Sequence, residues 1–359
     1  MLPRLESRGE TARHMVLLTP VLALALTVLT GMVLFASLGY PPFKAIYTFF
    51  VSPISSGYGL AELFVKATPL VLIAVGLAIG FRANVWNIGA EGQLTLGAIA
   101  GGALAVYFPE SENPLMLPAM MILGVFGGMA WAAIPALLKT RYNTNEILSS
   151  LMLTYVATLL LSVLVHGPWR DPAGYNFPQS VLFPDSAIAP ILLSGTRLHI
   201  GALIAFFVVL VGWLLLARSM IGFQVKVSGF APAASDYAGF RRNRIIWFAL
   251  LLAGGLAGLA GIIEVAGPIG QLLPSISPGY GFTAIIVAFL GRLHPLGILV
   301  AGLVLALSYL GGETVQIEMG LPQGIAGVFQ GMLLFFLLAC DVLIKYRIRF
   351  GKPATVTSS

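Results

Sequence analysis

Long apolar stretches without charge alternate with short polar segments along most of the chain. A helix needs about 20 apolar residues to cross the hydrocarbon core of a bilayer, with a range of about 17–25. By this rule the pattern predicts an all-α polytopic membrane protein with about ten transmembrane helices. The spans are expected near residues 15–38, 63–81, 93–108, 115–138, 147–166, 198–217, 245–264, 279–292, 295–311 and 324–344.

The ends of the chain are more polar than its middle. We expect a cytoplasmic N-terminal segment at 1–14, a single transmembrane domain at 15–344 and a cytoplasmic tail at 345–359. The apolar run that follows residue 14 is too long for a signal-peptide core and lacks a small-residue cleavage site, which indicates a retained first span.

One polar segment interrupts sequence that is otherwise typical of membrane helices. Residues 67–80 and 94–108 carry no charge, whereas the polar break between them (residues 82–93) contains Arg82, Asn84, Asn87, Glu91 and Gln93. A charge near the bilayer centre costs about 2.5–3.5 kcal/mol on insertion scales. Backbone that leaves a helix inside lipid must also be satisfied by protein or by water in a cavity. The break therefore indicates a transport path or a protein interface; the alternative is an ordinary cytoplasmic turn.

Two further regions suggest broken or re-entrant helices. The spans at 279–292 and 295–311 are short and nearly continuous, which is consistent with a bent hairpin, and 63–93 could contain a re-entrant piece. Residues 281–302 echo the polar break weakly: both segments begin Gly-Phe, carry one arginine and return to a glycine-spaced helix. The echo suggests an inverted repeat with a substrate route between its halves, although chance similarity is the alternative.

Composition and charge place the chain firmly in the membrane class. It is 58% hydrophobic and 9% charged, with a mean hydropathy of +0.93, whereas soluble domains carry about 25% charged residues. Its net charge is +6. The basic residues collect at span ends that share one side of the ten-span topology, which predicts cytoplasmic termini and argues against a nucleic-acid partner. The opposite side keeps only Lys44, Lys66, Arg170 and Arg197.

Few residues suggest catalysis or metal binding. The single cysteine, Cys340, excludes an internal disulfide framework, and the four histidines lack ligand spacing. The only Gly-Lys pair, Gly351-Lys352, is followed by proline and lacks the rest of a phosphate-binding loop. We therefore expect no metal, no enzymatic activity and no ATP site in this chain.

Two loops stand out by their length. Residues 167–197 contain five prolines, which predicts an extended external loop. Residues 218–244 contain a short segment with Pro232 suited to a first helical turn and Gly239 suited to a stop. A helix this short is unstable alone in water, so it needs a partner surface.

Small residues at four-residue spacing predict close helix packing. Such pairs occur at Gly97/Gly101, Gly124/Gly128, Gly254/Gly258 and Gly327/Gly331.

The segment FRANVWNIGAEGQLTLGA (81–98) resembles the signature of bacterial ABC-importer permeases of the ribose, branched-chain amino acid and nucleoside superfamily. NIGAEGQ (87–93) is most similar to the nucleoside, or simple sugar, branch, and the resemblance extends over about 67–349. It implies a type II ABC importer-like permease domain in the bacterial cytoplasmic (inner) membrane. It also implies two ABC ATPase subunits or domains that use ATP, a second permease subunit (a related chain or a copy), and an external substrate-binding protein. This chain itself is expected to bind no cofactor.

The resemblance also implies roles for particular residues. The inner loop, called the coupling loop below (218–244), resembles the segment that docks into the ATPase. The positions that match this segment are Gly222, Phe223, Gly229, Phe230, Pro232, Ala234, Tyr237, Gly239 and Arg241. Arg241 could steer docking, or it could merely set the topology.

For the substrate path, the sequence suggests residues of the polar break together with residues of the short predicted span at 279–292, which could face the break. The candidates are Trp86, Asn87, Glu91, Gln93, Phe282, Phe289 and Arg292. Aromatic faces and amides suit a nucleobase and ribose, so nucleoside import is the leading hypothesis. A ribose-like sugar or a flavin-like vitamin is the alternative within the same architecture. An ion-coupled secondary transporter would instead use Glu91, Glu264 and Glu313 as cation-binding carboxylates. Glu91 could equally be structural.

Overall fold

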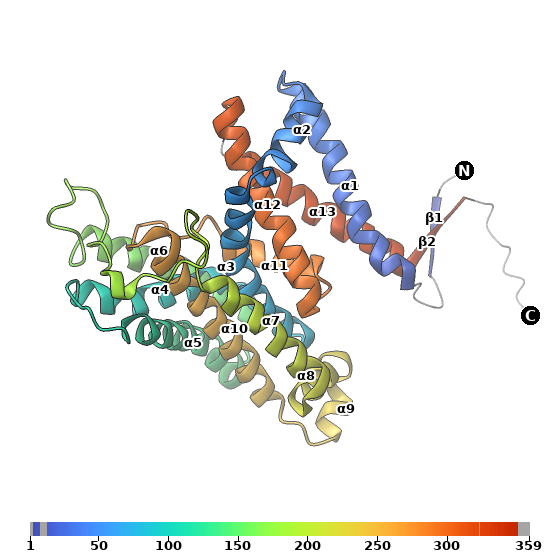
Figure 1. Cartoon of the computed structure of the whole chain (residues 1–359). Coiled ribbons are helices and arrows are strands. Elements are labelled where there is room, and N and C mark those ends of the chain that lie inside the picture. Colours follow the sequence, from blue (N-terminus) through green and yellow to red (C-terminus); the bar gives the residue numbers. More distant parts are fainter. Residues whose placement is uncertain (1–2, 8–12, 323, 351–359) are drawn as a thin grey trace, which may run out of the picture. The chain divides into compact units, whose positions relative to one another are not determined.

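The computed structural model describes residues 3–7, 13–322 and 324–350. It is helical apart from one two-stranded ribbon (Figure 1). Two compact units can be distinguished: unit 1 comprises Met1–Pro53 and Gly311–Ser359, and unit 2 comprises Ile54–Leu310.

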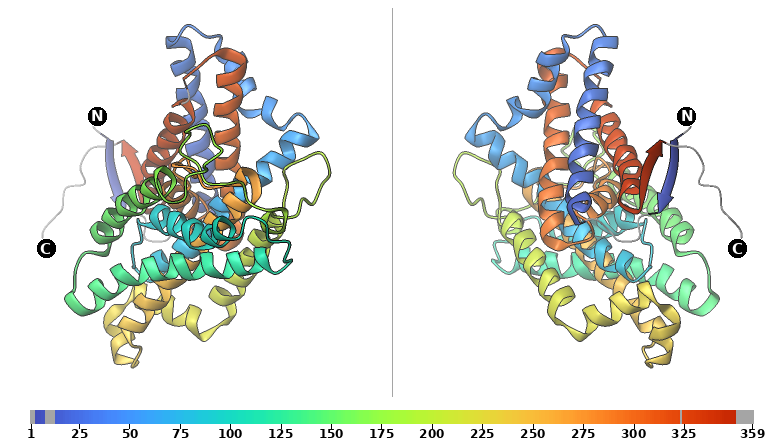
Figure 2. Two further views of the ribbon diagram at one scale, coloured as in Figure 1. Left: turned by 90° about the vertical axis from the view of Figure 1, so that its left-hand side faces the viewer. Right: turned by 90° about the vertical axis from the view of Figure 1, so that its right-hand side faces the viewer.

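Unit 1 contains the two ends of the chain. Its elements are β1 (Pro3–Ser7), α1 (Arg13–Ser37), α2 (Pro42–Phe50), the 3-10 turn η1 (Ser52–Ile54) at its boundary, the last part of α12 (Pro295–Met319), α13 (Ile325–Lys345) and β2 (Tyr346–Phe350). The strands pair antiparallel, with Pro3 opposite Phe350, and lie side by side in both views of Figure 2. Parts of the expected terminal segments (1–14 and 345–359) therefore form this ribbon, whereas 1–2, 8–12 and 351–359 lie outside the described residues.

Unit 2 holds most of the helices. They are α3 (Gly57–Arg82), α4 (Ala90–Tyr107), α5 (Met116–Tyr142), α6 (Glu146–His166), the 3-10 turn η2 (Asp185–Ala187), α7 (Gly201–Arg218), α8 (Met220–Phe230), α9 (Pro232–Tyr237), α10 (Arg242–Glu264) with a π-helical end η3 (Val265–Ile269), α11 (Tyr280–Leu290) and the first part of α12. α3 is the most enclosed of the long apolar helices, because it packs against α7, α10 and α11.

Every expected span coincides with a helix. Among the described residues, seven helices are long and apolar enough to cross a membrane. The helices at the other three expected spans do not meet this criterion of length and hydropathy. α4 begins with the polar residues of the break, α11 has only 11 residues, and α13 counts as a shorter apolar helix over Ile325–Cys340. The expected break between 279–292 and 295–311 is confirmed, since α11 ends at Leu290 and α12 begins at Pro295.

Glycines allow α10 to approach its neighbours closely. A Cβ on Gly258 would collide with the carbonyl of Gly124 in α5, and a Cβ on Gly97 in α4 would collide with Gly258. The packing expected from small-residue pairs is therefore confirmed for α4, α5 and α10. At Gly327 and Gly331 no atom of the described chain lies within 4 Å of the Cβ position, so within this chain these two glycines make no such close contact.

The weak echo between the two Gly-Phe segments does not correspond to equivalent local structure. Gly80 and Phe81 end α3, whereas Gly281 and Phe282 begin α11. That alignment of an inverted repeat is therefore wrong. The two regions do share one feature: in each, two helices are separated by residues with a left-handed backbone conformation. These residues are Asn84 in the first region and Arg292 and Leu293 in the second.

The proline-rich loop 167–197 is extended, as expected, and it is fastened to the connection that follows α10. Backbone hydrogen bonds join Ser180 to Leu272 (2.9 Å), Phe183 to Gly270 (2.9 Å) and Ala189 to Ala266 (2.8 Å). At its end, Arg197 donates two hydrogen bonds to the carboxylate of Glu62 in α3, at 2.9 and 2.6 Å. This pairing raises the pKa of Arg197 above its ordinary value. The loop thus links the start of α3 to the chain between α10 and α11.

Candidate functional site

The polar break forms the turn between α3 and α4. α3 ends because Asn84 adopts a left-handed conformation (φ 57°), which lets the Val85 amide donate back to the carbonyl of Gly80 at 2.9 Å. The indole of Trp86 then donates to the side chain of Asn84 at 3.1 Å. The turn is therefore closed by its own side chains and backbone.

Two predicted polar residues pair with each other inside the protein. Asn87 donates to Gln93 at 2.8 Å and accepts from it at 3.2 Å, and both side chains are buried. Asn87 also accepts from the Gly89 amide at 3.1 Å, just before α4 begins. The two side-chain amides satisfy each other, so that burying them is not costly. Together with the bond to Gly89, the pair holds the backbone in place where α4 begins.

Glu91 reaches a helix that lies far away in the sequence. Its buried carboxylate accepts a hydrogen bond of 2.6 Å from the Gly281 amide in the first turn of α11. The backbones also touch here, because a Cβ on Gly281 would collide with Glu91. A carboxylate at this place suits the positive end of the α11 dipole. The geometry favours the structural interpretation of Glu91 left open by the sequence.

Arg82, at the other side of the break, contacts the far end of the same helix. Its Nε donates to the carbonyl of Leu293 at 2.9 Å, in the turn after α11. Both Arg292 and Leu293 have positive φ values there (57° and 54°). Arg82 thus satisfies a carbonyl in a turn that lacks regular helical bonding.

Three aromatic rings gather where the break faces α11. Phe81 and Phe289 stack with centroids 5.3 Å apart, and Trp86 lies 5.0 Å from Phe81 and 5.9 Å from Phe289. Trp86 and Phe289 are half-buried, so part of this aromatic triad (Phe81, Trp86, Phe289) remains accessible. Aromatic faces of this kind stack on the apolar faces of sugars and bases.

The other predicted path residues lie apart from the triad. Phe282 is in the first turn of α11, two turns from Phe289, and is 40% exposed. Arg292 is half-buried in the turn that follows α11. The structure therefore brings together Trp86 with Phe289 and Asn87 with Gln93, and it places Phe282 and Arg292 at opposite ends of α11.

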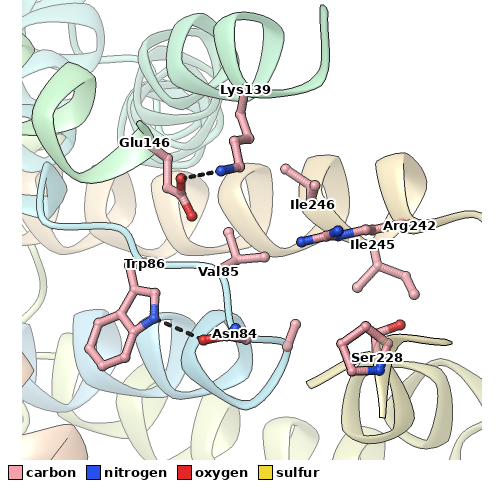
Figure 3. A pocket seen from close by; sticks show the side chains of 11 residues that line it. Asn84, Val85, Trp86, Lys139, Glu146, Ser228, Arg242, Ile245 and Ile246 are labelled. Atoms are coloured by element: carbon pink, nitrogen blue, oxygen red, sulfur yellow. Dashed lines mark hydrogen bonds and ion pairs between the residues drawn. The ribbon is translucent and has the colours of Figure 1, made fainter. Parts of the chain in front are cut away.

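A cavity of about 240 Å³ adjoins the break (Figure 3). An ion pair between Lys139 and Glu146 (2.9 Å) borders it on one side, while Trp86 and Asn84 face it on another and Arg242 reaches in from the start of α10. Its volume is below the range of about 300–1,000 Å³ that is usual for ligand pockets.

The coupling loop folds as two helices. α9 begins at Pro232 and ends before Gly239, whose φ is 77°, as predicted, whereas α8 was not expected. The buried hydroxyls of Ser228 and Ser235 join the two helices at 2.8 Å.

The predicted docking residues divide into a supporting and an exposed set. Gly222 and Gly229 pack closely against the end of α7 and the end of α3, respectively. Phe230 is 83% exposed and Tyr237 is 96% exposed. Phe223 packs edge-on against Phe240, and the remaining predicted positions, Pro232, Ala234, Gly239 and Arg241, are exposed. Large exposed aromatic side chains on two neighbouring short helices are typical of a surface that a partner covers.

Sequence reasoning missed several residues that complete this site. Phe81 supplies the third ring of the triad, the hydroxyl of Ser150 accepts from the Ile88 amide at 3.3 Å, and Ser277 accepts from the Tyr280 amide at 2.9 Å. Phe81 lies within an apolar run and the serines lie far from the break, so no local pattern marks them. The charge of Arg82 was visible in the sequence, but its partner was not.

Known proteins resemble the chain over most of its length. A family model described as the permease component of branched-chain amino acid transport systems matches residues 59–338. A glucose ABC transporter permease protein of Haloferax volcanii, TsgB13, is 36% identical over 340 residues, which cover 92% of this chain and 89% of that protein. A guanosine ABC transporter permease protein of Bacillus subtilis, NupP, is 27% identical over 338 residues, covering 93% and 95%. Among solved structures, a chain of PsaBC from Streptococcus pneumoniae in complex with a Fab matches with a TM-score of 0.47 and 12% identity, covering 81% of this chain and 94% of that one. The family match contains both the polar break and the coupling loop.

Proposed function

Since the chain belongs to the family of branched-chain amino acid transport permease components, we propose that it forms the solute path of an ATP-driven importer for a sugar-containing solute. A permease component of this family is a multi-pass membrane protein without catalytic activity or a cofactor of its own. ATP is hydrolysed by a partner ATPase, and a binding protein is a general partner of such importers.

The observation that carries the solute path is the aromatic triad at the polar break. Its rings come from the end of α3, from the break and from α11, so a change in the position of α11 alters the surface that they present. Buried amides and a carboxylate hold the backbone around it. Trp86 and Phe289 would contact the solute, Asn87, Gln93 and Glu91 would hold the path in shape, and Phe282 and Arg292 would face it at the two ends of α11.

Two solute classes fit this proposal. A monosaccharide is favoured by the relative with 36% identity, which is named for glucose. A nucleoside is favoured by the relative with 27% identity, which is named for guanosine, and by the NIGAEGQ segment. Both solutes combine an apolar ring face with hydroxyl groups. We place the monosaccharide first, because its relative is the more similar one.

The proposed assembly contains two permease subunits, two ATPase subunits or domains and an external binding protein. The cavity at the break would form one part of a path that a second permease subunit completes. The exposed Phe230 and Tyr237 would enter a groove of the ATPase, with Arg241 beside them. The loop 167–197 would receive the binding protein.

The proposed topology has ten crossings in a type II importer-like arrangement within the cytoplasmic membrane. Both termini and the coupling loop would be cytoplasmic, which is supported by the concentration of basic residues in the inner segments. In this arrangement α4 and α13 add two crossings to the seven long apolar helices. The tenth crossing would be made by the short α11 together with the connection that precedes it.

Uptake by cells with and without the gene tests the solute class. Labelled glucose and labelled guanosine are supplied in turn, and each is competed with excess unlabelled hexose, ribose, nucleoside or riboflavin. Gene-dependent uptake of glucose that only sugars compete supports the first candidate, and gene-dependent uptake of guanosine that only nucleosides compete supports the second. Absence of gene-dependent uptake of every solute contradicts the proposal.

The triad is tested in the same cells. Trp86→Ala should lower uptake of the identified solute about tenfold, because a stacking surface is lost, while Trp86→Phe should retain most of it. Trp213→Ala in α7, which removes an indole that is not part of the triad, is the matched control. Equal uptake in Trp86→Ala and wild type would exclude the triad from the path.

A further inference from the structure

α11 is too short to span a bilayer. Its 11 residues extend about 16 Å at 1.5 Å per residue, about half of a hydrocarbon core of 30 Å. Its first residues, Tyr280 and Gly281, are buried, and the turn after Leu290 is partly buried. Terminal amides and carbonyls at such ends are satisfied largely by groups of the protein.

The partner at the N-terminal end of α11 is Glu91. Its carboxylate accepts from the Gly281 amide at 2.6 Å, and the hydroxyl of Ser277 accepts from the amides of Gly279 (3.1 Å) and Tyr280 (2.9 Å). The amides of Tyr280 and Gly281 at this helix end are thereby paired with one side chain from the preceding connection and one from α4.

The partner at the C-terminal end of α11 is Arg82. Its Nε donates to the carbonyl of Leu293 at 2.9 Å. A carboxylate at the N-terminal end and a guanidinium at the C-terminal end both oppose the helix dipole. The two charged residues that frame the polar break thus hold the two ends of one short helix.

The coupling loop touches the same arginine. Gly229, near the end of α8, lies against the main-chain carbonyl of Arg82, and a Cβ at Gly229 would collide with that carbonyl. Any displacement of α8 that preserves this close contact must displace the last turn of α3. The side chain of Arg82 passes that displacement to the turn after α11.

We propose that α11 is a gate helix, fixed in place at its N-terminal end by Glu91, and that Arg82 is the positioning residue that transmits motion of the coupling loop to its C-terminal end. This inference rests on the proposed function, since it requires an ATPase that moves α8. Phe289 would follow the helix, so the aromatic triad opens or closes with the position of α8.

Arg82→Gln tests the transmission in the complete importer, with its ATPase, second permease subunit and binding protein reconstituted in liposomes. ATP hydrolysis and solute uptake are measured on the same sample. The variant should retain ATP hydrolysis within about twofold and lose uptake about tenfold, because a hydrogen bond from a charged group is removed. The number of ATP molecules hydrolysed per solute should therefore rise. Arg141→Gln, which removes an exposed arginine from the end of α5, should leave this ratio unchanged.

Gly229→Ala supplies a second test at the other side of the contact. The added Cβ separates α8 from Arg82 without altering the guanidinium, and the ratio of ATP to solute should again rise. The Gly229→Ala variant also tests the transmission if the Arg82→Gln importer does not assemble. An unchanged ratio in Gly229→Ala, or in a well-assembled Arg82→Gln importer, overturns the inference. Absence of uptake by the wild-type importer would instead contradict the proposed function.

Discussion

At the scale of single residues, the polar break is a set of matched donors and acceptors. Asn87 and Gln93 satisfy each other, Glu91 satisfies an amide of α11, and Arg82 satisfies a carbonyl beyond it. A buried polar group without a partner costs about 1–3 kcal/mol. Each of these residues therefore matters to the local structure, whether or not it touches the solute.

Substitutions at Glu91 separate a structural hydrogen bond from ion coupling. Glu91→Gln keeps an oxygen that can accept from the Gly281 amide, so it should retain most uptake and thermal stability. Glu91→Ala leaves that amide unpaired and should cost about 1–3 kcal/mol of stability and most uptake. Uptake assays and thermal unfolding of the purified complex measure the difference. If Gln is as inactive as Ala although the complex is stable, the negative charge itself is required, as an ion-coupled transporter would need.

His199 should make stability depend on pH. It lies just before α7, and burial lowers its pKa to about 4, partly opposed by the nearby Glu62. In the unfolded chain a histidine titrates near 6.5, so between pH 6.5 and 4 the unfolded state binds the extra proton. Stability is therefore complete above about pH 6.5 and falls as the pH drops towards 4, by about 1–3 kcal/mol.

The matched variant for this prediction is His199→Gln. Its amide oxygen can still accept from the Gly201 amide, as the histidine Nδ1 does at 3.2 Å, but it does not titrate. The fall in melting temperature from pH 7.5 to pH 5 should be smaller in the variant than in the wild type. Equal falls would show that His199 does not contribute to the pH dependence.

At the scale of elements, contact between helices depends on where small residues face one another. Gly258 of α10 lies between Gly97 of α4 and Gly124 of α5, with backbone against backbone. Gly327 of α13 has the same sequence spacing, yet among the described residues nothing approaches its Cβ position. The same motif therefore has different consequences on different helices.

Alanine substitutions should reveal this difference. Gly258→Ala forces the helices apart and should destabilise the protein by about 1–3 kcal/mol. Gly327→Ala should be neutral or stabilising by up to about 1 kcal/mol, since alanine favours a helix more than glycine does. Thermal unfolding in detergent measures both. A neutral Gly258→Ala would show that α10 can shift without cost.

At the scale of the whole molecule, the proposed topology places the coupling loop and the loop 167–197 on opposite sides of the membrane. Each contains a highly exposed tyrosine: Tyr175 is 94% exposed and Tyr237 is 96% exposed. These positions can report the side on which each loop lies. Cys340, the single cysteine, is buried and can be replaced by serine to give a background without thiols.

In that background, Tyr175→Cys should react with a membrane-impermeant maleimide in intact cells. Tyr237→Cys should react only after the cells are permeabilised, in cells without the ATPase that would cover it. Labelling is read from a mass shift of the purified chain. The reverse pattern would invert the orientation inferred from the basic residues.

The sequence by itself determined the class of structure, because hydropathy is a local property. Apolar length located every helix that corresponds to a span, Pro232 and Gly239 bounded α9, and the uncharged flanks made the polar break visible. Partition between water and lipid depends only on the residues of each segment, so these features could be predicted without knowing their neighbours. The family signature also lies within one continuous segment.

Only the tertiary structure decided what the polar residues of the break contact. Glu91 lies 190 positions from Gly281 in the sequence, and Arg82 lies 211 positions from Leu293. Phe81 joined the aromatic triad although it looks like any apolar residue of α3, whereas Phe282, predicted as a partner, lies two turns away from Phe289. The identity of a hydrogen-bond or stacking partner depends on how helices that are distant in the sequence pack together. The glycine contacts of α10 and α8 set this packing through the shape of the backbone. Hydropathy does not record that shape.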